Sequence, residues 1–451
     1  MGSTGSEGLR EADRKTELPR EHVLRRTLNA EVHARPFARL NAPEQATHLA
    51  MLSGEAGVAA DYAHLVSLCR RYGVSPPDSA ANHAWLDFGK FRLKWERHTE
   101  FCTYTFFRNA PLTCRPFERP VLDSLPADWV ETIPGEVLAA VNLVLEPSDS
   151  PETSLESLTE GVPSLMGSEA FAAASVSGGA AVAFMDFAID PRGFGRVVVN
   201  DRGLKPRQAG RLVQRLLEIE TYRMLALLAV PLAREHGREL TLLGERLSAI
   251  TQRLPEIQGL EEERELLSQI TTLSARAEAI AAATQYRFSA AKAYYALVQR
   301  RIEELREGRV EGYQTLTQFV DRRLAPAMRT CEAVRERLDT LSRRLTRAGN
   351  LLRTRVDIQL EGQNRDLLQS MDRRARLQLR LQETVEGLSV AAITYYAVSL
   401  INYAARGVEA SGVPLPVAGI TAAAIPLVAG GVWYAIRRVR RYIERQNEGT
   451  A

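Results

Sequence analysis

The chain has 451 residues, of which 45% are hydrophobic and 25% are charged, and its formal net charge is +3. This length allows about two or three domains, and the composition excludes a disordered, collagen-like or disulfide-dense protein. The small net charge gives no general attraction for nucleic acid, so no nucleic-acid partner is expected.

The start of the chain and its cysteines exclude two further classes of protein. Residues 1–20 are polar and lack the apolar core of a signal peptide, so they are expected to form a disordered tail. The cysteines have neither C-x-x-C nor zinc-finger spacing, which predicts small core residues instead of a disulfide framework or a structural metal site. They are Cys69, Cys102, Cys114 and Cys331.

Residues 21–205 have the mixed pattern of an α+β domain. W-L-D-F-G-K-F-R-L-K-W-E-R and F-C-T-Y-T-F-F-R alternate apolar and polar residues across a short turn, which predicts a β-hairpin. Further strands are expected at L-A-A-V-N-L-V-L and A-V-A-F-M-D-F-A-I, the latter turning through D-P-R-G-F-G into R-V-V-V-N. A helix around His48 to Tyr72, an antiparallel sheet and an exposed loop at 146–168 complete the predicted domain.

Residues 206–384 have a helical period and predict a stalk of long helices or coiled coil. Pro255, Gly308 and Pro326 are expected to separate these helices. The heptad seams suit pairing either within one chain or between chains. One seam holds Leu243, Leu247, Ile250, Leu254 and Ile257, and the other holds Cys331, Val334, Leu338, Leu341 and Leu345.

Two uncharged stretches follow, nineteen residues between Glu386 and Arg406 and twenty-seven between Glu409 and Arg437. About 20 apolar residues cross the hydrocarbon layer, so residues 385–436 predict a transmembrane hairpin with spans at 385–405 and 413–436. The alternative is a buried hairpin in a soluble protein.

Arginines flank both spans on one side and predict their orientation. By the positive-inside rule both chain ends stay in the cytoplasm, with residues 437–451 as a basic tail. These arginines are also expected to contact lipid head groups. They are Arg373, Arg374, Arg437, Arg438, Arg440 and Arg441.

Candidate chemistry in the α+β domain is sparse. Glu31, His33 and Arg35 alternate in L-N-A-E-V-H-A-R-P-F, so an extended strand would place them on one face as an anion-binding or general-base group. No nucleophile motif accompanies them, so binding is favoured over catalysis. Other histidines lack metal-ligand spacing, and no metal or cofactor is expected. Glu218, Glu220 and Arg223 are expected to form an internal ion-pair group.

Four motifs stand out along the chain: E-V-H-A-R-P at 31–36, A-G-R-L-V-Q-R-L-L-E-I-E-T-Y-R at 209–223, R-R-L-A-P-A-M-R-T-C at 322–331 and L-Q-L-R-L-Q-E-T-V-E-G-L-S-V at 377–390. They resemble a bacterial family of unknown function, described as predicted membrane-anchored proteins. The resemblance implies membrane anchoring and brings no activity, substrate or catalytic residue.

The order of elements also has a looser likeness to CorA-type magnesium channels. That family ends its first span with a Gly-Met-Asn signature, whereas this chain has L-I-N-Y-A-A-R-G, in which Asn402 alone stands near that position. The leading hypothesis is a non-enzymatic homo-oligomer, anchored in the bacterial inner membrane and facing the cytoplasm. It is expected to act as a binding, scaffold or regulatory module, with a possible cytoplasmic protein partner. The alternative is a CorA-like ion channel whose pore is lined by Ser399, Asn402 and Tyr403.

Overall fold

The structure is a computed structural model, and the chain divides into two compact units, Met1–Gln252 with Ile270–Arg347, and Arg253–Gln269 with Ala348–Ala451. The predicted order of elements is confirmed: a mixed α/β sheet domain, then long helices, then an apolar helix pair. The residues described are 21–25, 28–29, 37–53, 57–109, 117–148, 162–167, 171–257, 259–410 and 416–447.

Nine strands of the described residues form one sheet in the order β2-β3-β4-β1-β5-β8-β7-β6-β9. The sheet is mixed, because β5 and β8 pair in parallel while the other pairs are antiparallel. The antiparallel prediction was wrong at this pair, since the chain returns through β6 and β7 before β8. The strands are β1 Glu44–Leu52, β2 His83–Asp87, β3 Arg92–Arg97, β4 Cys102–Asn109, β5 Glu136–Pro147, β6 Ala172–Val176, β7 Ala181–Met185, β8 Gly195–Asp201 and β9 Gly308–Arg309.

Helices α2 (Val58–Tyr72) and α6 (Pro206–Leu227) cover opposite faces of the sheet. Leu93 and Trp95 of β3 belong to the apolar core that includes Leu65 and Leu68 of α2. Lys94, between them, reaches Gln214 of α6. Successive residues of a strand point to opposite faces, so the two helices lie on opposite sides. Two short helices, α3 (Ala127–Glu131) and α5 (Val162–Met166), complete the domain.

Three details of the predicted domain are corrected. The residues around His48 form strand β1, not the start of a helix. This strand is central and buried on both faces, so its sequence lacks the alternation that marks a half-exposed strand. The strand expected from Trp85 is divided into β2 and β3 by a turn at Phe88–Phe91. The predicted exposed loop contains α5, whose Val162 and Met166 are buried.

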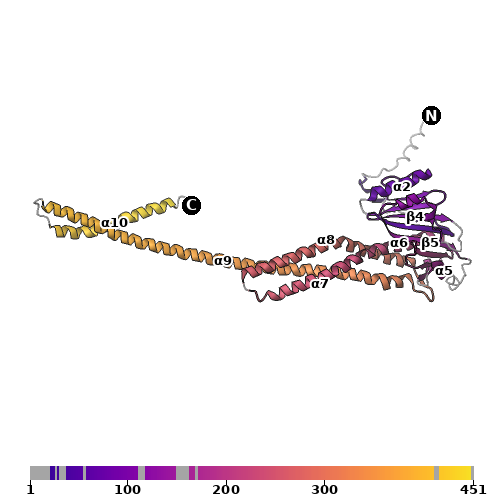
Figure 1. Ribbon diagram of the computed structural model, residues 1–451. Helices are drawn as coiled ribbons and strands as arrows, with labels where there is room; N and C mark the ends of the chain where they lie inside the picture. Colours follow the sequence, from indigo (N-terminus) through magenta and orange to yellow (C-terminus); the bar gives the residue numbers. More distant parts are fainter. Residues whose placement is uncertain are drawn as a thin grey trace, which may run out of the picture. The chain divides into compact units, whose positions relative to one another are not determined.

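The long helices are α7 (Ala229–Arg253), α8 (Leu260–Leu305) and α9 (Leu316–Ala410). Nine residues of the predicted heptad seams are buried within the single chain, and Ile257 is half-buried. In the first unit, Glu239 of α7 pairs with Arg276 of α8, and Gly237 of α7 faces Val334 of α9. The helices therefore run side by side there (Figure 1).

Pro326 does not end a helix, contrary to the prediction, and lies inside α9. An internal proline removes one helical hydrogen bond and costs about 3 kcal/mol. The neighbouring Leu324 and Met328 are buried. We attribute the continuity of the helix to this packing, which offsets the local cost.

The second unit holds the end of α9 and helix α10 (Val417–Asn447), which lie beside each other (Figure 1). Thr421 of α10 donates a hydrogen bond to the Asn402 amide oxygen at 3.3 Å. By length and composition, two helices of the described residues contain segments that could cross a membrane, one in α9 and the other Val417–Val439. Only 0% and 6% of those segments are buried.

Gly210 supplies a test of how α6 packs. A Cβ atom at Gly210 would lie 1.8 Å from the Ala38 carbonyl oxygen, so Gly210→Ala should destabilise the protein by about 2 kcal/mol or more. Gly244 of α7 has nothing within 4 Å of such an atom, so Gly244→Ala should be neutral or stabilising by up to about 1 kcal/mol. Chemical unfolding of both variants measures this, and equal stability of the two would contradict the packing described.

Candidate functional site

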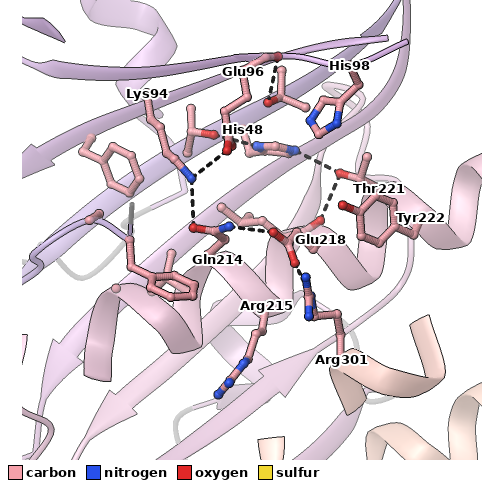
Figure 2. A pocket seen from close by; sticks show the side chains of 18 of the residues that line it. His48, Lys94, Glu96, His98, Gln214, Arg215, Glu218, Thr221, Tyr222 and Arg301 are labelled. Atoms are coloured by element: carbon pink, nitrogen blue, oxygen red, sulfur yellow. Dashed lines mark hydrogen bonds and ion pairs between the residues drawn. The ribbon is translucent and has the colours of Figure 1, made fainter. Parts of the chain in front are cut away.

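A cavity of about 340 Å³ lies between the sheet and helix α6. Strands β1, β3 and β4 supply one wall, α6 supplies the opposite wall, and Arg301 and Glu304 of α8 line one side. Figure 2 shows the polar side chains of these walls pointing toward one another across the space. Three separate parts of the chain therefore meet at this cavity.

The polar wall of the sheet results from the alternation of β3 and β4. Along each of these strands, successive side chains point alternately into the apolar core under α2 and into the cavity under α6. Such polar positions usually face water, yet here they are buried because α6 covers them. Lys94, Thr105 and His48 are neighbours across three adjacent strands. The buried polar residues of this wall are His48, Lys94, Glu96, Thr103 and Thr105.

His48 is held between two threonines. The Thr221 hydroxyl donates to the Leu217 carbonyl at 3.0 Å, so its oxygen accepts from His48 Nε2, also at 3.0 Å. His48 Nδ1 then accepts from the Thr105 hydroxyl at 2.8 Å. Both nitrogens of a neutral imidazole are satisfied. Burial, assisted by the nearby Lys94 cation, lowers the pKa of His48 to about 3, so the ring is uncharged at neutral pH.

A chain of charged and polar side chains crosses the cavity. Lys94 Nζ lies 3.0 Å from a Glu96 carboxylate oxygen and donates to the Gln214 amide oxygen at 2.8 Å. The Gln214 amide nitrogen donates to Glu218 at 2.6 Å. Glu218 in turn pairs with Arg301 of α8. This row of side chains connects the sheet to α6, and α6 to α8.

Glu304 extends these contacts along α8. Its carboxylate accepts from Arg301 and from Arg215 of α6, each at 3.0 Å. Burial opposes the charge on Arg301, but the Glu218 and Glu304 carboxylates raise the pKa of its guanidinium. Arg301 therefore stays charged and holds the two helices together.

The turn between β3 and β4 forms the edge of the cavity and is fixed to α8. His98 and Phe101 line the cavity, and their rings stack at 4.1 Å. Glu100, between them, accepts from the Tyr294 hydroxyl at 2.6 Å and pairs with Arg287 at 2.9 Å. Burial, together with the Glu100 carboxylate, raises the pKa of Tyr294, so its hydroxyl remains a donor. The same helix thus holds both the side and the edge of the cavity.

The sequence did not identify these cavity residues. Glu31, His33 and Arg35 lie outside the described residues, although Phe37, two residues after Arg35, lines the cavity. Of the expected ion-pair group, Glu220 pairs with Arg223, whereas Glu218 pairs with Arg301. The available signal was the helical spacing of Gln214, Glu218 and Thr221, which places all three on one face of α6.

The candidate pore and lipid-contact residues lie in the second unit. Ser399 and Asn402 are half-buried, and Asn402 bonds to Thr421 of α10. Tyr403 is 72% exposed. Arg373 and Arg374 are exposed on α9, and the Arg437 guanidinium lies 4.8 Å from the centre of the Trp433 ring. Arg438 is exposed too, and the side chains of Arg440 and Arg441 lie outside the described residues.

In the described ranges, no group of three or more His, Cys, Asp or Glu side chains is placed to hold a metal ion. Cys69, Cys102 and Cys331 are buried free thiols, as expected of core residues. Cys114 lies outside the described residues.

Comparison with known families decides where the chain belongs. The family model described as a protein of unknown function (DUF3422) matches residues 20–443. The chain belongs to this family. The match extends over the sheet domain, the long helices and the apolar helix pair, and it confirms the resemblance to a family of unknown function. No curated protein matches the chain.

The buried His48 predicts a pH dependence of stability. Its folded pKa is below the ordinary value of 6.5, so only the unfolded chain takes up this proton between pH 6.5 and about 3. Its contribution to stability is therefore complete above pH 6.5 and is lost as the pH falls toward 3. Between pH 6.5 and 4.5 the free energy of unfolding should fall by roughly 2 kcal/mol more in the wild type than in His48→Gln.

Chemical unfolding followed by tryptophan fluorescence measures this difference. His83→Gln is the control, because His83 is only half-buried on β2. It should keep the wild-type slope. A His48→Gln slope equal to that of the wild type would contradict a neutral, buried His48.

Proposed function

We propose that the protein is a non-enzymatic, membrane-anchored binding module whose sheet domain holds a small polar ligand in the cavity between the sheet and α6. The observation that carries this proposal is that three parts of the chain, β3, α6 and α8, place charged side chains around one space. Ligand pockets commonly measure about 300–1,000 Å³ and combine apolar walls with a few polar groups. The volume of about 340 Å³ suits a small molecule.

The geometry of His48 favours binding over catalysis. General-base catalysis needs an imidazole nitrogen within reach of the substrate proton. Both nitrogens of His48 are occupied by Thr105 and Thr221. The ring therefore orders the wall of the cavity and does not take up a proton.

A regulatory role is supported by the way the cavity is connected. A ligand that contacts Glu218 would change its bond to Arg301, which joins α6 to α8. The Glu100 contact couples the cavity edge to the same helix. Binding would therefore alter how α8 is held, which is the differential contact that a ligand-dependent switch requires.

The two apolar segments support anchoring in a membrane. We place the sheet domain on the cytoplasmic face of the bacterial inner membrane, because the arginines before the first span and after the second would stay on that side. In this arrangement, the ligand is a cytoplasmic metabolite or a group presented by a cytoplasmic protein partner.

The binding proposal predicts stabilisation by a cellular small molecule. The small-molecule fraction of a bacterial extract should raise the thermal unfolding midpoint of the detergent-purified protein, because a ligand that binds only the folded state stabilises it. The double variant Lys94→Met with Glu96→Gln removes a buried ion pair without leaving one charge alone, and it should lose this response. Lys90→Met is the control, since Lys90 is exposed. A response equal in the wild type and the double variant, or absent from both, would contradict binding in this cavity.

Self-association through α9 forms the second part of the proposal. Residues 360–388 place apolar side chains at alternating spacings of four and three, in a register that also contains Asn364, Arg374 and Gln378. Met371 is 59% exposed and Leu381 is 66% exposed. The apolar members of this stripe are Leu360, Leu367, Met371, Leu381, Val385 and Leu388.

A second copy of the chain is the partner that this stripe suits best. Copies anchored in one membrane point the same way, so the stripe of one meets the same stripe of another in a parallel arrangement. Amphipathic helices take most of their stability from packing of the apolar face. Parallel pairing would supply that packing and set the register through the polar positions.

Two glutamate substitutions, two residues apart, test this association. Met371→Glu places a charge in the stripe and should reduce the subunit number of the protein in nanodiscs. Gln369→Glu introduces the same residue on the opposite face of α9 and should leave it unchanged. Light scattering coupled to size-exclusion chromatography measures the subunit number. A monomeric wild type, or an unchanged Met371→Glu oligomer, would contradict pairing through α9.

A further inference from the structure

The charges around the cavity balance one another. Three cations and three carboxylates line it, and His48 is uncharged at neutral pH. His98 also lines the cavity, where its ring stacks on Phe101. The six charged residues are Lys94, Arg215, Arg301, Glu96, Glu218 and Glu304.

A ligand of net charge would disturb this balance. An anion that took Lys94 from Glu96 would leave a carboxylate without its cation, in a side chain that is only 11% exposed. A cation that took Glu218 from Arg301 would leave Glu304 as the one remaining acid partner of Arg301 among the residues that line the cavity. Separating a buried pair is costly because the remaining charge is desolvated and uncompensated. A zwitterion adds no net charge to the cavity, because its carboxylate shares Lys94 with Glu96 while its ammonium shares Glu218 with Arg301.

Gln214 shows which arrangement of charge fits. Its amide oxygen accepts from Lys94 at 2.8 Å, while its amide nitrogen donates to Glu218 at 2.6 Å. A cation and an anion of the protein thus stand on either side of one small dipolar group (Figure 2). The carboxylate and ammonium of an α-amino acid have the same polarity, and they are almost as close together as the oxygen and nitrogen of an amide.

We propose that the cavity binds a small zwitterion of the α-amino-acid type, with its carboxylate at Lys94 and its ammonium at Glu218. The proposal rests on the binding function proposed above and specifies the class of ligand. When the zwitterion binds between Lys94 and Glu218, the Gln214 side chain moves out of this space or forms hydrogen bonds to the ligand.

The apolar part of the cavity indicates the side chain of the ligand. Phe37, Phe101, Phe107 and Val213 line the same space as the charged groups. A volume of about 340 Å³ holds an amino acid with an apolar side chain. An aliphatic or aromatic side chain would remove these surfaces from water and add affinity that the polar contacts alone do not supply.

Calorimetric titration of the full chain in detergent tests the inference with two amino acids and their singly charged analogues. L-Leucine is compared with isoamylamine and 4-methylpentanoate, and L-phenylalanine with phenethylamine and 3-phenylpropanoate. At least one amino acid should bind, and its amine and acid analogues should bind at least tenfold more weakly. Glu218→Gln should weaken the amino acid at least tenfold, whereas Glu303→Gln, an exposed change on α8, should not.

The analogues keep the test decisive even if Glu218→Gln does not fold, because they probe the wild-type protein. An analogue that binds within threefold of its amino acid overturns the inference. So does the absence of binding by both amino acids. If the bacterial extract still stabilises the wild type in that case, the binding function stands with a different ligand class, and if it does not, both fail.

Discussion

Helix α6 lies across a polar face of the sheet, and the arrangement of the first unit follows from that packing. Burying polar groups without partners is costly, so the buried polar side chains of β1, β3 and β4 need hydrogen-bond partners, and α6 supplies two of them. Thr221 is the hydrogen-bond partner of His48, and Gln214 is that of Lys94. Gly210 lets α6 pack closely against the segment before β1, because a larger residue would collide with the Ala38 backbone.

The same requirement extends to the long helices. Glu218 needs Arg301, and the buried Glu100 needs Tyr294 and Arg287, so α8 is held against the sheet domain at both places. An aromatic stack fixes α9 in a similar way: Phe187 stacks on Phe319 at 4.1 Å. The Arg223 guanidinium lies near the Phe187 ring and the Arg323 guanidinium near the Phe319 ring. The helices of this unit are therefore packed onto the sheet domain and do not serve only as a spacer.

The spacing of apolar residues in the sequence predicted the elements that are buried on one side or are apolar along their whole length. The β3–β4 hairpin, the helical seams and the two apolar segments belong to this group. Strand β1 was missed because burial on both faces removes the alternation of apolar and polar residues. A helix break was wrongly predicted at Pro326, because the packing around this residue outweighs the local cost of a proline inside a helix. The cavity could not be predicted, since Lys94, Gln214 and Arg301 are far apart in sequence and meet only through tertiary structure. Local patterns carry no information about which distant segment will cover a polar face.

Strand β9 has a consequence for the order in which the protein is made. Gly308 and Arg309 pair with β6 and complete the sheet only after α8 has been synthesised. The first apolar segment begins about 75 residues later, at 385, and synthesis proceeds at about 5–20 residues per second. The sheet therefore has several seconds to close before that segment is synthesised. The sheet domain can thus fold before the apolar helix pair is complete.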